Sequence, residues 1–290
     1  MNYNIETWKK HMVSLDTGIN MAYYETGPAQ GTPLLLIHGV TDGHVSWMQM
    51  APMLARAGCR CIIVEYRGNG ATDKPDCGES GYTAEMIAED ILNLMNKIGL
   101  ERCHAVGHSF GSLICQELAI KDPSRFRSYT LIDTTSDCRN NPVFRMLLNG
   151  DGHGFRGIYG YSDHLPEDFL LDWTQMNNED EAFRQATLDN VKNMPMLAWQ
   201  NLIRGLAKFH NDRLGSMPEP VQVIWGTEDD IFPMKDQELV RKKLSRCNAT
   251  FIPMEGASHN GFWDSLRSCR AYAEQILRFT QGERYFTGKS

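Results

Sequence analysis

Short, nearly continuous apolar runs alternate along most of the chain with segments whose apolar residues have helical spacing. The apolar runs occupy residues 34–37, 59–64, 103–106, 128–132, 221–225 and 249–252. Helical spacing falls between or after them, at residues 47–56, 85–98, 112–121, 235–244 and 264–279. Strands that lack a polar face are typical of a parallel sheet covered by helices on both sides. The pattern therefore predicts an α/β fold.

Two departures from this alternation complete the predicted architecture. Residues 12–15 and 19–24 are joined by a turn-forming Asp-Thr-Gly and predict an antiparallel hairpin, so the mostly parallel sheet is expected to be mixed. Residues 134–217 show no convincing apolar strand. Helices are expected within them at 167–173, 179–191 and 197–208. We predict a core domain of residues 1–133 and 218–290, interrupted by a helical insertion.

The segment Gly107-His108-Ser109-Phe110-Gly111 lies between a predicted strand and a predicted helix. In this setting G-x-S-x-G is the pattern of a nucleophile elbow, a sharp turn that lifts a serine hydroxyl above the end of the sheet. The flanking glycines leave room for the strained backbone of the serine. A serine that only caps the following helix is the alternative, and the presence of catalytic partners decides between the two.

A serine hydroxyl is a weak nucleophile near neutral pH, so it needs a base that removes its proton and a carboxylate that orients the base. Residues 228–230, which read Glu-Asp-Asp, follow one predicted strand, and His259 follows the last one. Asp133, at the end of another predicted strand, is a further acid. The carboxyl ends of parallel strands meet at one edge of the sheet. We therefore expect Ser109, His259 and one of these acids to meet there.

The strand predicted at residues 34–37 leads into a His-Gly-Val-Thr segment at the same edge. Cleavage of an acyl bond builds negative charge on the carbonyl oxygen, and an aimed backbone N–H group stabilises that charge by about 3 kcal/mol. We expect the N–H groups of Val40 and of Phe110, the residue after the serine, to form this oxyanion hole. His38 is expected to shape the loop rather than to exchange protons.

Several motifs occur in a characteristic order. They are His38-Gly39 with Trp47 downstream, residues 66–75, the elbow, Gly226-x-x-Asp229-x-x-x-Pro233 and Gly256-x-x-His259. Over essentially the whole chain this order resembles the α/β-hydrolase superfamily, specifically its serine esterase-like members with a helical cap. The resemblance implies Ser109 as nucleophile, His259 as base and Asp229 as acid. Asp230 is the local rival, and some hydrolases place the acid where Asp133 stands.

The same resemblance implies that residues 134–217 form the cap. The chain departs from the family pattern in a structural turn. The family commonly has Asp, His and Ser where this chain has Glu65, Asn69 and Thr72. Aromatic residues are frequent in the cap, where they line an apolar pocket or join the cap to the core. They are Phe144, Phe155, Tyr159, Tyr161, Phe169, Trp173, Phe183 and Trp199.

Composition and charge limit the classes of partner that the protein is expected to bind. The chain has 290 residues and a net charge of −7, without the run of Lys and Arg that nucleic acid requires or an apolar stretch long enough to span a membrane. Because the first residues lack the apolar region of a signal peptide, we expect a cytoplasmic protein whose eight cysteines are reduced. The spacing of potential ligands predicts no metal site and no cofactor. A small-molecule substrate is the expected partner, and a homodimer is left open.

The resemblance implies a serine hydrolase, in particular a carboxylesterase that acts on small or medium, largely apolar esters through an acyl-enzyme. His38, Trp47 and His108 are the expected substrate contacts. Because His259 must be neutral to act as base, activity is expected to fall at acid pH with an apparent pKa near that of histidine.

Other activities remain open. Cleavage of a carbon–carbon bond beside a ketone, and hydrolysis of a lactone or amide, use the same triad, and peracid formation is a further side activity. Haloalkane dehalogenases and epoxide hydrolases are disfavoured, because relatives with those activities carry an aspartate in the position of Ser109. A ligand-binding receptor built on a hydrolase scaffold is the alternative from another class.

Overall fold

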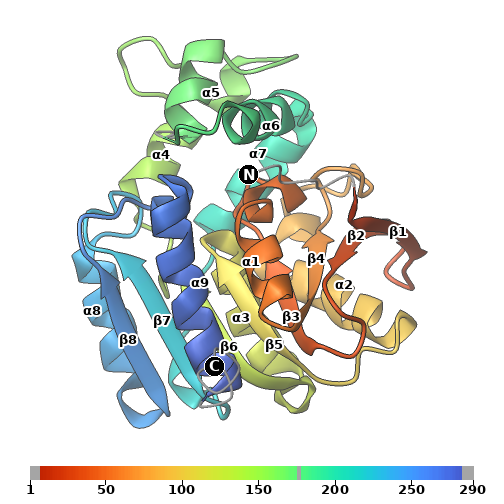
Figure 1. Ribbon diagram of the computed structural model, residues 1–290. Coiled ribbons are helices and arrows are strands. Elements are labelled where there is room, and N and C mark those ends of the chain that lie inside the picture. The colour runs from red at the N-terminus through yellow and green to blue at the C-terminus, as the bar shows by residue number, and fades with distance from the viewer. Residues whose placement is uncertain (1–6, 175–177, 283–290) are drawn as a thin grey trace.

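The computed structural model describes residues 7–174 and 178–282, and within them the central feature is an eight-stranded sheet (Figure 1). Its strands are β1 (Lys9–Ser14), β2 (Asn20–Thr26), β3 (Thr32–Ile37), β4 (Cys59–Glu65), β5 (Cys103–His108), β6 (Phe126–Ile132), β7 (Val221–Gly226) and β8 (Ala249–Met254). They stand in the order β1-β2-β4-β3-β5-β6-β7-β8. The β1–β2 and β2–β4 pairs are antiparallel and the others parallel, so the prediction of a mixed sheet is confirmed.

The central strands are apolar because both of their faces are covered. Every residue of β5 and of β7 is buried, whereas β1 and β8 at the two edges alternate with exposed positions. The chain places β4 on one side of β3 and β5 on the other. At such a change of direction the loops that follow the two strands diverge and leave a crevice, which is where open α/β sheets bind ligands.

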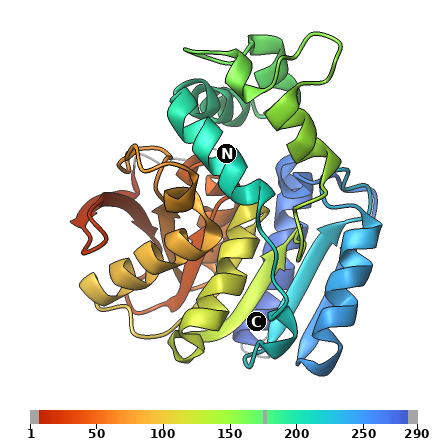
Figure 2. The ribbon, with the colours of Figure 1, turned by 180° about the vertical axis from the view of Figure 1, so that it is seen from behind.

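Nine α-helices lie in the described residues. They are α1 (Met50–Arg56), α2 (Ala84–Lys97), α3 (Phe110–Lys121), α4 (Pro142–Asn149), α5 (Glu167–Thr174), α6 (Glu181–Lys192), α7 (Met196–Ala207), α8 (Met234–Lys243) and α9 (Leu266–Gln281). Helices α1 and α9 cover one face of the sheet and α2, α3 and α8 the other, as the front and back views show (Figures 1 and 2). None of the helices in these residues has both the length and the apolar composition needed to cross a bilayer.

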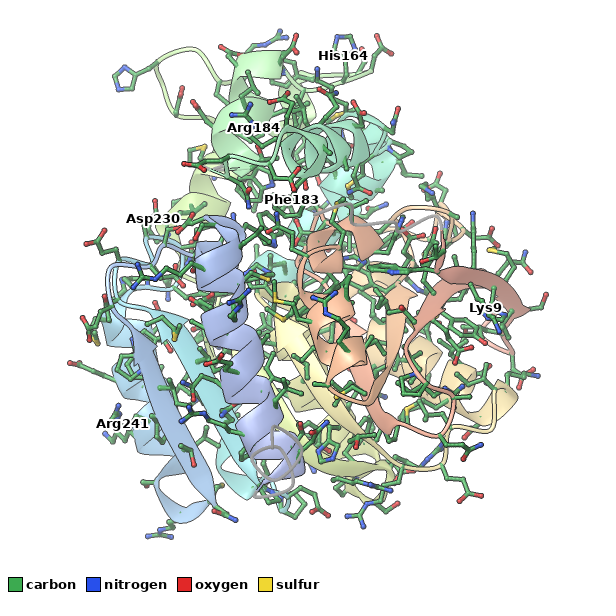
Figure 3. All side chains as sticks on the ribbon, in the orientation of Figure 1. Lys9, His164, Phe183, Arg184, Asp230 and Arg241 are labelled. Atoms are coloured by element: carbon green, nitrogen blue, oxygen red, sulfur yellow. The ribbon has the colours of Figure 1, made fainter. Side chains whose placement is uncertain are left out.

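Helices α4 to α7 lie above the carboxyl ends of the strands, and we refer to them as the overlying helices (Figure 1). Sequence spacing indicated α5, α6 and α7 but not α4. Its start has a recognisable signal, since the side chain of Asn141 accepts hydrogen bonds from the N–H groups of Val143 and Phe144 and Pro142 follows it directly. Phe183 of α6 is fully buried beneath these helices and packs edge-on against Trp263 of the core (Figure 3).

A buried ion pair joins the segment after β4 to α2. Arg67 Nε and Nη2 donate to the two carboxylate oxygens of Asp90 at 2.6 and 2.7 Å, and the side chains are 5% and 0% exposed. Removal of one partner leaves the other charge buried without compensation.

We therefore expect Asp90→Ala to lower the free energy of unfolding by about 3–5 kcal/mol. The matched control is Glu85→Ala on the same helix, because Glu85 is 72% exposed and meets Lys121 at 3.6 Å. That change is expected to cost less than about 1 kcal/mol. Urea unfolding of the two variants measures the difference, and equal losses would contradict the assignment of Asp90 as the buried anchor.

Candidate active site

Ser109 stands between β5 and α3 with a φ of +50°, a value that non-glycine residues rarely adopt. The glycines on either side make this turn sterically possible. A Cβ atom on Gly107 would lie 2.2 Å from the carbonyl oxygen of Gly111, and one on Gly111 would lie 2.2 Å from that of Ile37. The pattern G-x-S-x-G thus allows the start of α3 to pack directly on the end of β3.

Ser109, His259 and Asp229 form a continuous chain of hydrogen bonds. His259 Nε2 lies 2.8 Å from Ser109 Oγ, and His259 Nδ1 lies 2.8 Å from Asp229 Oδ2. The other oxygen of Asp229 accepts the N–H groups of Ile231 at 2.9 Å and Phe232 at 2.8 Å. Because a carboxylate only accepts, Nδ1 carries a proton, and when the imidazole is neutral the lone pair of Nε2 faces the serine hydroxyl. All three partners are at most 6% exposed.

The two ionisable partners shift each other's pKa in opposite directions. Burial by itself lowers the pKa of His259, but the charge and hydrogen bond of Asp229 outweigh it and raise that pKa to about 9. Burial likewise opposes ionisation of Asp229, and His259 together with two backbone N–H groups still lowers the pKa of Asp229 below its usual value. The expectation that His259 titrates like an ordinary histidine is therefore corrected upward.

The two rival acids do not contact the imidazole of His259 in the described residues. Asp133 follows β6 with a φ of +48°, and its Oδ1 accepts the N–H of Gly226 at 2.8 Å. Its Oδ2 is buried without a hydrogen bond in the same part of the chain. Burial, followed by the charge of Asp229, raises the pKa of Asp133 well above the usual range and keeps its carboxyl neutral. Asp230 is exposed and lies at the left of the view in Figure 3, below the overlying helices.

The loop after β3 is held from three directions. The hydroxyl of Tyr66 donates to the carbonyl oxygen of Gly39, and His38 Nδ1 lies 2.7 Å from the same oxygen. The His38 ring also stacks on Tyr66 with 4.2 Å between centroids. At the preceding peptide, between His38 and Gly39, Asp42 Oδ2 accepts the N–H of Gly39 at 2.9 Å. These contacts fix the backbone around Val40, whose N–H donates to no residue that the structure describes.

The overlying helices reach the same loop through Thr41. Trp173 Nε1 donates to Thr41 Oγ1 at 2.7 Å, and Asn190 Nδ2 donates to the carbonyl oxygen of Thr41 at 3.1 Å. Behind Trp173 the rings of Phe169 and Phe155 continue as a stack, with angles of 15° and 5° between successive planes. The side chains of α5 are thus coupled to the loop that carries Val40.

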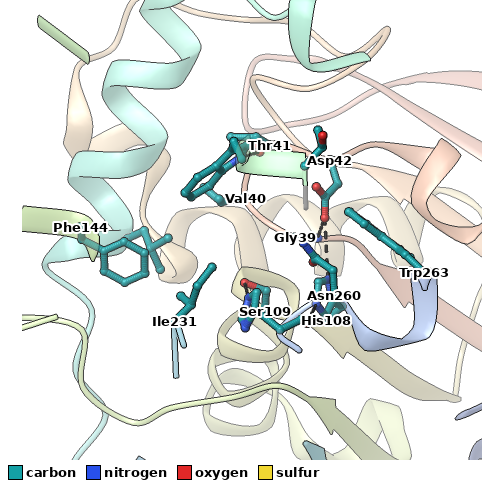
Figure 4. A pocket seen from close by; sticks show the side chains of 14 residues that line it. Gly39, Val40, Thr41, Asp42, His108, Ser109, Phe144, Ile231, Asn260 and Trp263 are labelled. Carbon is teal, nitrogen blue, oxygen red and sulfur yellow. Dashed lines mark hydrogen bonds and ion pairs between the residues drawn. The ribbon is translucent and has the colours of Figure 1, made fainter. Parts of the chain in front are cut away.

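A pocket opens above Ser109 (Figure 4). Its lining residues are Gly39, Val40, Thr41, Asp42, His108, Ser109, Phe144, Trp173, Thr174, Leu206, Ile231, His259, Asn260 and Trp263. Phe144 and Ile231 lie on one side of Ser109, and Asp42 and Trp263 on the other (Figure 4). The pocket therefore has an apolar end and a polar end.

Of the three expected substrate contacts, only His108 lines this pocket. Trp47 is fully buried and stacks on Phe262 in the core, with 5.7 Å between the ring centroids, and His38 is buried beneath the loop. Sequence reasoning missed Asp42 and Asn260 as pocket residues. The available signal was their position in the sequence. Asp42 lies in the loop after β3, and Asn260 directly follows His259. Among the described residues no three His, Cys, Asp or Glu side chains gather as a metal site.

The geometry agrees with the comparisons to known proteins. Residues 32–266 match the family described as alpha/beta hydrolase fold, and the chain belongs to that family, as the motifs predicted. Epoxide hydrolase 2 of Caenorhabditis elegans is 25% identical over 94% of this chain and 81% of its own. A protein of Variovorax paradoxus, named as a candidate carbamate hydrolase, is 33% identical over 82% of this chain and 90% of its own. A crystal structure of a hydrolase from Pseudomonas aeruginosa has a TM-score of 0.79 and 18% identity, covering 94% of this chain and 98% of that one.

The contact between Asp229 and His259 predicts a measurable titration. NMR of the His259 imidazole should give a pKa near 9 in the wild type, since Asp229 favours the imidazolium. Asp229→Asn removes the two largest influences that raise the pKa of His259, so burial should bring that pKa below the value of about 6.5 for a free histidine. Asp133→Asn is the matched control and should move the pKa much less, because the carboxyl of Asp133 is already neutral. An unchanged pKa in Asp229→Asn would refute this account.

Proposed function

We propose that the protein is a serine hydrolase that cleaves carboxylic esters of small or medium, largely apolar substrates. The hydrogen-bond chain from Ser109 through His259 to Asp229 is the observation that carries the proposal. A buried serine hydroxyl aimed at the free lone pair of an imidazole, which a carboxylate orients, is a nucleophile with its base in place.

In the acylation step, Ser109 Oγ attacks the ester carbonyl carbon while its proton moves to His259 Nε2. The resulting imidazolium is stabilised by the negative charge of Asp229, which stays ionised. Collapse of the tetrahedral intermediate breaks the bond to the alcohol oxygen, and His259 returns the proton to that oxygen. The products of the step are a free alcohol and an ester on Ser109.

Deacylation repeats the sequence with water. His259 takes a proton from the attacking water, and the bond to Ser109 Oγ breaks to release the carboxylic acid. In both steps the carbonyl oxygen becomes an oxyanion. We assign its stabilisation to the N–H groups of Val40 and Phe110, which donate to no protein group in the described residues and are worth about 3 kcal/mol each.

The lining of the pocket supports a modest, largely apolar substrate. The apolar end, with Phe144, Leu206 and Ile231, suits a short hydrocarbon chain. We propose that residues 134–217 form a cap that encloses this hydrocarbon chain of the substrate. We also propose a cytoplasmic location for the protein.

Epoxide hydrolysis, which the name of one relative suggests, fits this site poorly. Attack of a serine oxygen on an epoxide carbon would leave an ether on Ser109. An ether has no carbonyl carbon for water to attack, so His259 would have no route to release the product. An ester leaves an acyl group, which the same machinery hydrolyses.

A carbamate is the second candidate, because the relative with 33% identity is named as a candidate carbamate hydrolase. A carbamate also offers an acyl carbon to Ser109 and a leaving group to His259. Comparison of 4-nitrophenyl butanoate with 4-nitrophenyl N-ethylcarbamate, matched in chain length, decides between the two. The ester proposal requires sustained turnover of the butanoate and a lower kcat/KM for the carbamate.

A fluorophosphonate probe tests the nucleophile. Wild-type protein should be labelled covalently, and Ser109→Ala should not, because the probe traps only an activated serine. Ser124→Ala, at an exposed serine after α3, is the matched control and should label like the wild type. Well-folded wild type that resists labelling would sink the proposal.

The acid and the pH limb are tested together by kinetics on 4-nitrophenyl butanoate. Asp229→Asn should lower kcat by about 10⁴, whereas Asp133→Asn should lower it by less than about tenfold. An imidazolium cannot take the serine proton, so kcat/KM should fall as the pH falls through the pKa of His259, which is about 9. A wild-type profile that is flat between pH 6 and 9 would count against His259 as the base.

A further inference from the structure

Asp42 presents a carboxylate to the polar end of the pocket. Its Oδ2 accepts the N–H of Gly39 at 2.9 Å, whereas Oδ1 makes no hydrogen bond to any residue that the structure describes. The side chain is 12% exposed, and the pocket is where it is exposed. Figure 4 shows it on the side of Ser109 away from Phe144. The loop needs one of the two carboxylate oxygens, and the other remains free.

His108 adds a second acceptor beside this carboxylate. Its Nε2 donates to the carbonyl oxygen of His259 at 3.0 Å, so in the neutral ring Nδ1 holds a lone pair. Nδ1 is buried, has no hydrogen bond in the described part of the chain, and lies 3.8 Å from Asp42 Oδ2. With the ring neutral, two acceptors therefore lie close together, and Asp42 Oδ2 receives the N–H of Gly39 while His108 Nδ1 receives no donor from the described residues.

No lysine or arginine lines the pocket in the described residues, so the charge of Asp42 has no protein cation beside it there. A carboxylate that is largely removed from water gains most from a charged donor, because charge-assisted hydrogen bonds are about twice as strong as neutral ones. A primary ammonium group carries three donors, enough for Asp42, for His108 Nδ1 and for one water. A hydroxyl group supplies only one and no charge.

We propose that Asp42 and His108 form a subsite for a primary ammonium group, so that the preferred substrates are esters that carry an amine in one half. The subsite rests on the proposed ester hydrolysis at Ser109 and adds the substrate class. Phe144, Leu206 and Ile231 receive the apolar half, and the ammonium binds at the opposite end. The net charge of −7 attracts such cations to the protein.

Matched ester pairs test the subsite at pH 7. The first pair places the amine on the alcohol half, 4-(aminomethyl)phenyl butanoate against 4-ethylphenyl butanoate. The second places it on the acyl half, 4-nitrophenyl 4-(aminomethyl)cyclohexanecarboxylate against the 4-ethyl analogue. Wild type should favour the amine in one pair by at least about tenfold in kcat/KM, the usual worth of a hydrogen bond to a charged group. The pair that shows the preference tells which half the subsite holds.

The variant Asp42→Asn keeps an acceptor for the N–H of Gly39 but loses the charge. It should lose the amine preference, measured as the ratio of kcat/KM for the two members of a pair, so that any change in activity common to both esters cancels. Asp172→Asn is the matched control, because it removes an exposed charge on α5 outside the pocket and should retain the preference. A preference that survives in Asp42→Asn, or is absent from wild type in both pairs, would overturn the subsite.

A binding measurement separates this proposal from the proposed function. In Ser109→Ala, calorimetry should show 4-(aminomethyl)phenyl butanoate or its acyl-half counterpart binding at least about tenfold more tightly than the matched ethyl ester, and Ser109→Ala combined with Asp42→Asn should abolish the difference. If wild type turns over neutral esters but the binding difference is absent, only the subsite fails. If no ester is turned over but the binding difference is present, the proposed reaction fails and the subsite stands.

Discussion

The contact between the backbone of Gly111 and the carbonyl of Ile37 sets the geometry of the whole site. It brings the first turn of α3 against the end of β3, so Ser109 and the loop that carries Val40 become neighbours. The two segments are packed so closely that a single methyl group at Gly111 would collide with the carbonyl of Ile37. Ser109 accepts an unfavourable backbone conformation in return, and the buried sheet on both sides holds it there.

Electrostatics then divides the buried acids into two kinds. Asp229 is surrounded by donors and stays ionised beside His259, while Asp133 has one backbone donor and burial keeps it neutral. The difference lies first in the contact of Asp229 with His259, and then in the second backbone N–H group that its loop aims at the carboxylate. Position at a strand end alone does not make an aspartate the partner of the histidine.

The strands, the family and the order of the motifs were predictable from the sequence because they depend on local periodicity and on a few invariant steric needs. Helix α4 was missed although Asn141 and Pro142 mark its start, since it is only 8 residues long and gives too few turns for helical spacing to stand out. The pocket was not predictable. Trp47 turns into the core and Asp42 turns out of it, and that choice depends on packing against Phe262 and on the N–H of Gly39, which are distant or backbone partners.

The bond between Trp173 and Thr41 has a consequence for how such proteins diversify. Suppose that the overlying helices were replaced by those of a relative. Trp173 and Asn190 would leave with them, while Thr41, the loop residue that accepts both hydrogen bonds, would stay. The loop would then lose two of its supports, and the backbone around Val40 would be held less firmly. Thr41 therefore has to be exchanged together with the overlying helices, although it precedes Trp173 by more than a hundred positions.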